Sequence, residues 1–192
     1  MMDINLHSIV ILVGTVGSRR LHWAEQNFEP EEILSSDQIR IALTGRKDCY
    51  TQEHAVFSEL ERQARLRVQL GQRVVVDASN LKRTDRSSFE RIAQDFGVAC
   101  VIVVFDVPLE HKLSWLNQQE DHTQQVQLLH VQQSLFLQAQ KDLATASPGV
   151  SVFDHTDAIS IARRSITLPD KILAVGDVHG LSLIHISQGI VR

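Results

Sequence analysis

Short apolar runs alternate along the chain with longer stretches in which apolar residues recur every three or four positions. The residues Val74 to Val76 are all β-branched, which is typical of a central parallel strand buried on both faces. The alternation of strands and helices predicts an α/β fold with a doubly wound, mostly parallel, five-stranded sheet. The strands are predicted at residues 9–13, 32–36, 73–80, 99–107 and 150–153.

Helices are predicted between these strands. Thr51 is a suitable N-cap for the third helix, and Ser87 and Glu90 have the spacing of a capping box for the fourth. The last helical stretch is rich in glutamine, and no lysine or arginine occurs between Lys112 and Lys141. The predicted helices cover residues 22–28, 38–43, 51–70, 87–97 and 109–144.

Composition and charge narrow the class of protein. A chain of 192 residues with 43% hydrophobic and 22% charged residues fits one globular domain. A net charge of −4 argues against nucleic-acid binding by a broadly basic surface, although a local basic cleft stays possible. The apolar runs are too short to span a membrane, and Cys49 and Cys100 have no metal-site spacing. We therefore expect a soluble, cytoplasmic protein with reduced thiols.

The candidate chemistry begins directly after the first predicted strand. Gly14 ends the apolar run, and Gly17 and Ser18 lead into a helix, which is the arrangement of a phosphate-binding loop. The pattern G-x-x-x-x-G-K-[ST] would place glycine, lysine and a hydroxyl residue at positions 19, 20 and 21. This chain has Arg19, Arg20 and Leu21 there.

Other polar residues follow the predicted strands. Asp37 ends the second strand, and Arg40 lies one helical turn later on the same face. Asp77 ends the third strand. Because ligands of parallel α/β folds bind at the carboxyl ends of the strands, Gly14, Asp37 and Asp77 are expected to lie near one site.

These segments together resemble the P-loop kinase domain of polynucleotide kinase-like proteins, including the bacterial polynucleotide kinase-phosphatases. The resemblance extends from Ile9 to about Trp115, and it rests on the segments VGTVGS, SSDQIR, AVF, VVDASN and VFDVP. Further along, Gly176-Asp177-Val178-His179-Gly180 is similar to the opening metal-binding motif of metallophosphoesterases. The two motifs occur in the order found in the bifunctional proteins.

The resemblance implies a P-loop NTPase/kinase-like fold, ATP and Mg²⁺ as cofactors, and transfer of the γ-phosphoryl group to a 5′-hydroxyl. It implies that Asp37 deprotonates the acceptor, that Arg40 holds the acceptor phosphate and that Asp77 orients the metal. The nucleotide would contact Gly14, Gly17, Ser18, Arg19 and Arg20. The implied partners are a nucleotide, nucleic-acid 5′ ends and a phosphatase domain in a full-length parent, with no membrane.

The departures from the family pattern predict that transfer is impaired in this chain. Leu21 cannot ligate a metal ion, and Arg20 binds as a planar fork instead of a point charge. A side chain at position 19 in a glycine-only conformation costs on the order of 1–3 kcal/mol. If the lid that covers the phosphoryl group lies between Leu113 and Gln140, it contains no cation.

The expected domains are a kinase-like domain at residues 1–167, a linker and the first strand of a truncated metallophosphoesterase domain at 168–180, and an unrelated tail at 181–192. Asp177 and His179 are candidate metal ligands, but the remaining ligands would come from a full-length parent. Two other functions stay open: a non-catalytic pseudokinase scaffold for an attached metallophosphatase, and a small-molecule P-loop kinase. In the scaffold case Arg19 and Arg20 would fill the anion site themselves.

Overall fold

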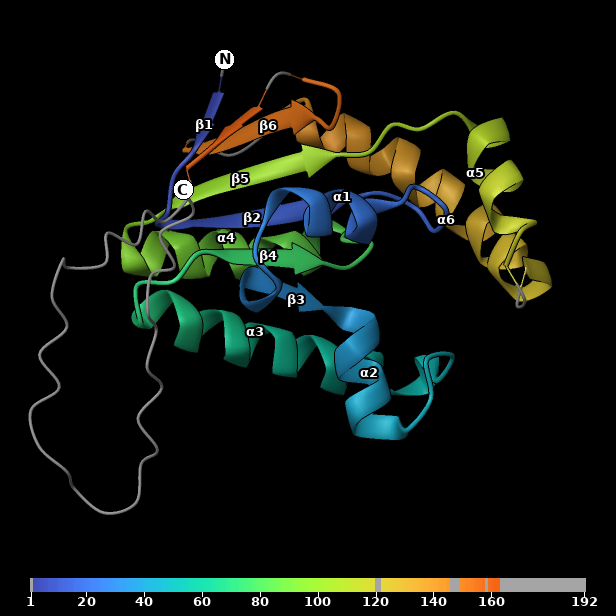
Figure 1. The fold of residues 1–192 in the computed structure, drawn as a ribbon, viewed down its shortest axis with the longest axis horizontal. Helices are drawn as coiled ribbons and strands as arrows, with labels where there is room; N and C mark the ends of the chain where they lie inside the picture. Colours follow the sequence, from blue (N-terminus) through green and yellow to red (C-terminus); the bar gives the residue numbers. More distant parts are fainter. Residues whose placement is uncertain (1, 120–121, 146–148, 158, 163–192) are drawn as a thin grey trace, which may run out of the picture.

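A computed structural model of the chain describes residues 2–119, 122–145, 149–157 and 159–162. Its centre is a five-stranded sheet in the order β3-β4-β2-β5-β6, in which every neighbouring pair is parallel (Figure 1). This confirms the predicted doubly wound sheet. The strands are β2 (Ser8–Val13), β3 (Ile33–Ser35), β4 (Val74–Asp77), β5 (Ala99–Val104) and β6 (Val150–Asp154).

Helices cover both faces of the sheet. One face packs against α3 (Glu53–Gln69), α4 (Arg83–Phe96) and α6 (His122–Leu143). The other face packs against α1 (Arg20–Asn27) and the small parallel pair of β1 (Met2–Ile4) and β7 (Ile159–Ile161). The remaining elements are α2 (Ser36–Thr44), α5 (Leu109–Leu116) and the 3-10 turns η1 (Pro30–Glu32) and η2 (Tyr50–Gln52).

The alternation of side chains along β2 explains why its sequence is apolar throughout. Ile9, Ile11 and Val13 belong to the core cluster under α3, α4 and α6, whereas Val10 and Leu12 belong to the cluster under α1. All five side chains are fully buried. A strand in this position has no solvent-facing side, so the polar–apolar alternation of an edge strand is absent.

Three predicted boundaries were wrong. The helical stretch at 109–144 is divided into α5 and α6, and α5 ends at the polar segment that begins with Asn117. Ser87 lies inside α4, where its hydroxyl donates to the carbonyl of Thr84, so it caps nothing. Thr51 lies in η2, and Gln52 is the N-cap of α3.

Within the described part of the chain, no helix is long and apolar enough to cross a membrane. The cytoplasmic location stays a prediction. The segments 168–180 and 181–192 lie outside the described residues, as do Asp177 and His179. The truncated phosphatase motif is therefore a sequence-based expectation only.

Candidate functional site

The glycine loop, residues 14–19, joins β2 to α1 at the carboxyl end of the sheet. The amide of Gly14 donates to the carbonyl of Ser79, 3.1 Å away, and this ties the loop to the chain after β4. A Cβ on Gly14 would lie only 2.8 Å from Ser18 Oγ and 3.0 Å from Phe105 Cβ, so a larger residue does not fit there. Gly17 has a φ of +82°, which favours glycine.

Arg19 has the backbone conformation that the sequence pattern reserves for glycine. Its φ of 58° and ψ of 31° lie in the left-handed region, immediately before α1 begins. For a residue with a side chain this conformation costs roughly 1–2 kcal/mol. The loop therefore keeps its path although the glycine has been replaced.

The guanidinium of Arg20 lies across the glycine loop. Its Nη1 donates to the carbonyl oxygens of Gly14 at 2.5 Å and Thr15 at 2.6 Å, and it lies 3.3 Å from Ser18 Oγ. Its Nε lies 3.5 Å from Oδ1 of Asp77. The cation that a phosphate would need is thus engaged with the protein itself.

Asp77 at the end of β4 is the buried carboxylate of the site. The hydroxyl of Ser35 donates to its Oδ2 at 3.3 Å, whereas Oδ1 has no hydrogen bond within the described part of the chain. Burial raises the pKa of this carboxyl, and the charge of Arg20 acts in the opposite direction. A buried oxygen that is ion-paired with Arg20 at 3.5 Å but accepts no hydrogen bond from the described residues fits a role as an acceptor for a ligand or a metal-bound water.

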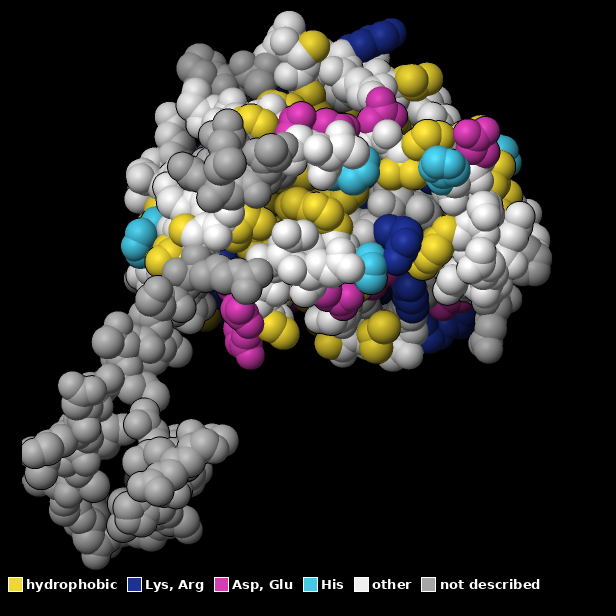
Figure 2. Space-filling model, turned by 45° about the horizontal axis from the view of Figure 1, so that its top comes forward, with side chains coloured by type: hydrophobic (Ala, Val, Ile, Leu, Met, Phe, Trp, Pro, Cys, Tyr) yellow, Lys and Arg dark blue, Asp and Glu magenta, His cyan; other side chains and the backbone are white. Residues whose placement is uncertain are grey.

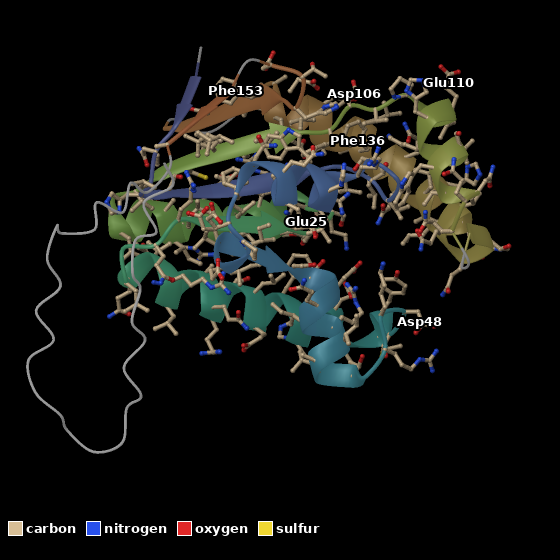
Figure 3. The ribbon with its side chains drawn as sticks, viewed as in Figure 1. Glu25, Asp48, Asp106, Glu110, Phe136 and Phe153 are labelled. Carbon is tan, nitrogen blue, oxygen red and sulfur yellow. The ribbon has the colours of Figure 1, made fainter. Side chains whose placement is uncertain are left out.

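Lys112 is a cation at the loop that the sequence analysis did not include. Its side chain on α5 is 1% exposed, and its Cβ would lie 3.1 Å from a Cβ on Gly17. Its Nζ lies 5.0 Å from the ring centroid of Phe136, and the carboxylate of Asp106 favours its charge. Figure 3 labels Phe136 and Asp106. Burial lowers the pKa of this ammonium, and the charge of Asp106 acts in the opposite direction.

The sequence contained one signal for Lys112. It is the last cation before the long stretch without lysine or arginine, but it lies one residue outside the expected lid. Gln132 on α6 was missed as well. Its Oε1 accepts the amide of Val16 at 2.7 Å, so a helix distant in sequence covers one of the loop donors.

Arg40 on α2 forms the centre of a second cluster. Its Nη1 donates to Oδ1 of Asp37 at 2.5 Å, and its Nε donates to Oε1 of Glu53 at 2.8 Å. The guanidinium also lies 4.9 Å from the ring centroid of Tyr50. Burial opposes the charge, but the hydrogen bonds from Glu53 and Asp37 outweigh it, so the pKa of Arg40 is raised.

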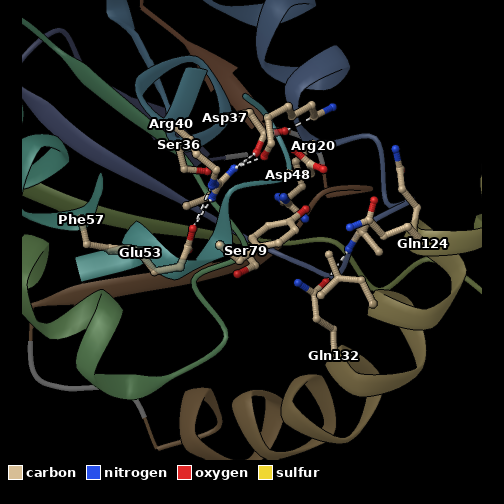
Figure 4. A pocket seen from close by; sticks show the side chains of 16 residues that line it. Arg20, Ser36, Asp37, Arg40, Asp48, Glu53, Phe57, Ser79, Gln124 and Gln132 are labelled. Atoms are coloured by element: carbon tan, nitrogen blue, oxygen red, sulfur yellow. Dashed lines mark hydrogen bonds and ion pairs between the residues drawn. The ribbon is translucent and has the colours of Figure 1, made fainter. Parts of the chain in front are cut away.

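A cavity of about 300 Å³ lies between the two clusters. Figure 4 shows Asp37, Arg40 and Arg20 on one side of it, with Gln124 and Gln132 of α6 facing them. Its lining residues are Val16, Arg20, Ser36, Asp37, Arg40, Lys47, Asp48, Tyr50, Glu53, Phe57, Ala78, Ser79, Gln124, Gln125, Leu128 and Gln132. We call it the acceptor cavity.

A second hollow of about 580 Å³ lies on the other side of the glycine loop, between α1 and α5. Trp23 and Phe105 meet edge to face there, and Phe105 stacks on His155 with ring centroids 4.9 Å apart. Figure 2 shows histidine side chains scattered among hydrophobic and polar ones over one face of the molecule. His22 and His111 line the same hollow.

The structure thus brings most of the predicted site residues together. Gly14, Gly17, Ser18, Arg19, Arg20 and Asp77 form one site, and Asp37 and Arg40 face it across the acceptor cavity. Their functional roles stay predictions.

The residues at the glycine loop fit the phosphates of ATP better than they fit Mg²⁺. The backbone of the loop fits a phosphate, because it precedes a helix N-terminus and carries cations beside it. For Mg²⁺ the fit is incomplete. Leu21 packs against the hydrophobic cluster under α1 instead of offering a hydroxyl, and no group of three metal-binding side chains occurs in the described ranges. At the loop, Asp77 is the side chain suited to that ion.

The chain is similar to several solved structures. A chain from a structure of the Pnkp1/Rnl/Hen1 RNA repair complex aligns with a TM-score of 0.56 and 14% identity, covering 72% of this chain and 47% of that chain. A second Pnkp1/Rnl/Hen1 complex aligns at 0.48 and 18%, covering 59% and 39%. The APS kinase CysC of Mycobacterium tuberculosis aligns at 0.48 and 16%, covering 84% and 92%.

At these identities the likeness is one of fold, and the chain spans less than half of the length of the Pnkp1-complex chains that it matches. A comparison with curated proteins finds no match. The family comparison is specific: the AAA domain model (AAA_33) matches residues 9–139. Because this match covers the glycine loop, both clusters and most of the sheet, the chain belongs to this family of P-loop kinase-like AAA domains.

Proposed function

We propose that this chain is an ATP-binding, kinase-like module whose transfer of a phosphoryl group to a hydroxyl acceptor is impaired. The observation that supports it most strongly is the meeting of the glycine loop, Arg20 and Asp77 where β2 and β4 end. Parallel α/β folds bind their ligands at this edge of the sheet. The backbone amides and the helix dipole at the start of α1 favour a phosphate there.

Lys112 is the second cation proposed to contact the nucleotide phosphates. It is buried against the loop at Gly17, and a buried ammonium costs free energy unless an anion lies beside it. The nucleoside would then occupy the aromatic hollow beside Trp23 and Phe105. These two assignments give a role to the buried Lys112 and to the aromatic hollow, neither of which the fold itself requires.

Impairment is proposed from three contacts. Arg20 binds loop carbonyls, Gln132 covers the amide of Val16, and Leu21 replaces the metal-binding hydroxyl. When bound, Mg²⁺ neutralises charge on the phosphate oxygens. A site that offers it Asp77 but lacks the hydroxyl is expected to hold it weakly.

Asp37 is the proposed general base for the acceptor hydroxyl, because it lines the acceptor cavity together with Arg20. The family resemblance suggests a polynucleotide 5′-hydroxyl as the acceptor and a phosphatase domain as the attached partner in a longer cytoplasmic protein. A small-molecule acceptor is the second candidate. The sequestration of Arg40 by Asp37 and Glu53 favours the second candidate. A non-catalytic scaffold differs from both because it needs no nucleotide.

Thermal unfolding with and without Mg-ATP tests the proposal. A ligand at ~100 times its dissociation constant adds roughly 2.7 kcal/mol to the free energy of unfolding. A stabilisation by millimolar Mg-ATP that inorganic phosphate does not reproduce supports nucleotide binding. No stabilisation at that concentration would refute it and leave the scaffold function. Stabilisation without phosphoryl transfer to any acceptor would identify a pseudokinase.

A further inference from the structure

The acceptor cavity is balanced in charge, although arginines line it. Its ionisable residues are three cations, Arg20, Arg40 and Lys47, and three carboxylates, Asp37, Asp48 and Glu53. A site built to hold a phosphate normally presents an excess of cations. The balance therefore raises the question of which cation in this cavity is available to a ligand.

Arg40 is not available. It is 3% exposed, and its Nη1, Nη2 and Nε atoms are directed at Asp37 and Glu53 at 2.5 to 2.8 Å. Nη1 also lies 3.4 Å from the carbonyl oxygen of Lys47. A guanidinium has five N–H donors in a fixed fork, and here that fork is directed at protein acceptors. Arg40 is thus placed to position Asp37 and Glu53.

The other two cations are engaged as well. Lys47 Nζ lies 3.3 Å from Oδ2 of Asp37, and Arg20 binds the carbonyls of the glycine loop. A phosphate on the acceptor would meet the carboxylates of Asp37 and Glu53 beside cations that already have partners in the protein. Like charges placed close together across a binding site repel each other, which weakens binding.

The uncharged lining has the chemistry of a hydroxyl-binding site. Ser36, Ser79 and Gln124 supply hydroxyl and amide groups, which both donate and accept hydrogen bonds, as ligand hydroxyls do. By contrast, the oxygens of an ionised phosphate mainly accept hydrogen bonds. The volume of about 300 Å³ is at the small end for ligand pockets and suits a molecule the size of one nucleoside or one sugar.

We propose that the acceptor cavity binds a neutral, hydroxyl-bearing small molecule and discriminates against acceptors that carry a phosphate group. The binding part of this inference stands on the cavity alone, whereas the phosphorylation of the bound hydroxyl rests on the proposed function. A free nucleoside and a free sugar share this chemistry. The 5′ end of a polynucleotide lacks this chemistry, because a charged phosphodiester follows its first nucleoside.

The sequence offers a single-site probe for the test. Tyr50 lines the cavity and is the one tyrosine of the chain, so incorporation of fluorotyrosine gives one ¹⁹F resonance from this site. We would titrate the labelled full chain with two pairs of probes that differ only in a phosphate: uridine with uridine 3′-phosphate, and glucose with glucose 6-phosphate. The expected result is that the neutral member of one pair shifts the signal at a concentration about tenfold lower than its phosphorylated partner.

A charge-removing variant sharpens the test. Glu53→Gln takes one carboxylate from Arg40, so the preference is expected to move about tenfold towards the phosphorylated probe. Glu59→Gln is the matched control on the same helix, because Glu59 pairs with Arg62 and does not line the cavity. This control should leave the ratio of the affinities for the neutral and the phosphorylated probe unchanged.

Two results would overturn the inference: equal or tighter binding of the phosphorylated probes by the unaltered chain, or no ¹⁹F response to any neutral probe. The probe pair that shifts the ¹⁹F signal shows whether the ligand is a nucleoside or a sugar. Mg-ATP stabilisation measured on the same sample reports the proposed function separately. If the chain binds uridine but is not stabilised by Mg-ATP, the inference about the acceptor cavity stands and the kinase proposal is refuted.

Discussion

The Arg20 guanidinium and the Asp77 carboxylate form an ion pair beside the glycine loop, with Nε 3.5 Å from Oδ1. The carboxylate is 9% exposed, and Arg20 simultaneously binds two loop carbonyls. The charge that neutralises Asp77 is therefore also the group that lies across the loop. Stability and ligand access are expected to be linked through this one side chain.

Arg20→Met is expected to lower the free energy of unfolding by about 1–3 kcal/mol at pH 7, because it leaves a buried carboxylate without its partner. The loss should shrink as the pH falls. Burial raises the pKa of Asp77 in the folded protein above 3.8, so the folded state takes up a proton first and gains stability towards low pH.

Urea unfolding of this variant between pH 4 and pH 7 measures the effect. Arg62→Met is the control, since Arg62 pairs with Glu59 on the surface of α3 and should contribute less than about 1 kcal/mol. An Arg20→Met penalty that stays constant over this range, or is no larger than the control, would show that the ion pair with Asp77 contributes nothing.

Arg19→Gly is expected to raise the free energy of unfolding by about 0.5–1 kcal/mol. The strain of the left-handed backbone is removed, and part of the gain is offset by the greater flexibility of glycine in the unfolded chain. Arg91→Gly is the matched control, because Arg91 lies exposed inside α4 and should lose about 1 kcal/mol there. Chemical denaturation compares the two, and a destabilised Arg19→Gly would contradict the assigned conformation.

Lys112→Met should stabilise the fold by about 1 kcal/mol and weaken any stabilisation by Mg-ATP. The variant removes a charge that burial disfavours while keeping the length of the side chain. Burial lowers the pKa of Lys112, so the gain should be largest below the folded pKa and shrink as the pH rises towards 10.5. Lys141→Met on the exposed side of α6 should change neither quantity. A destabilised Lys112→Met with unaltered ATP response would assign Lys112 a purely structural role.

The two cysteines should react at different rates. Burial raises the pKa of the Cys100 thiol to about 12, whereas Cys49 is partly exposed. A thiol reagent at pH 8 is expected to modify Cys49 in the folded protein and Cys100 only after unfolding. Mass spectrometry of the modified chain identifies the site, and rapid labelling of Cys100 would contradict the burial of β5.

The sequence predicted the parts of the fold that depend on local pattern. β2 and β4 could be located because strands buried on both faces are apolar throughout, and the pair of Asp37 and Arg40 followed from helical spacing. The glycine loop was located from Gly14 and Gly17: a Cβ on Gly14 would lie 2.8 Å from Ser18 Oγ, and Gly17 has a φ of +82°.

Contacts between distant segments could not be predicted in this way. The bond from Val16 to Gln132 joins residues 116 positions apart, and β1 pairs with β7 across almost the whole described chain. Lys112 was not included because it lies one residue before the expected lid, whereas packing of α5 on α6 buries it beside the glycine loop. The orientation of Arg20 likewise depends on the folded position of Asp77.

The central claim is that the glycine loop is a phosphate site weakened by the residues at positions 19–22. The most direct test compares the stabilisation of two proteins by the same concentration of Mg-ATP: the unaltered chain, and a variant carrying Arg19→Gly, Arg20→Lys, Leu21→Ser and His22→Thr. We predict a small gain for the unaltered chain and a gain approaching roughly 2.7 kcal/mol for the variant once Mg-ATP reaches ~100 times its dissociation constant. A variant that folds but gains no more stability than the unaltered chain would contradict the account.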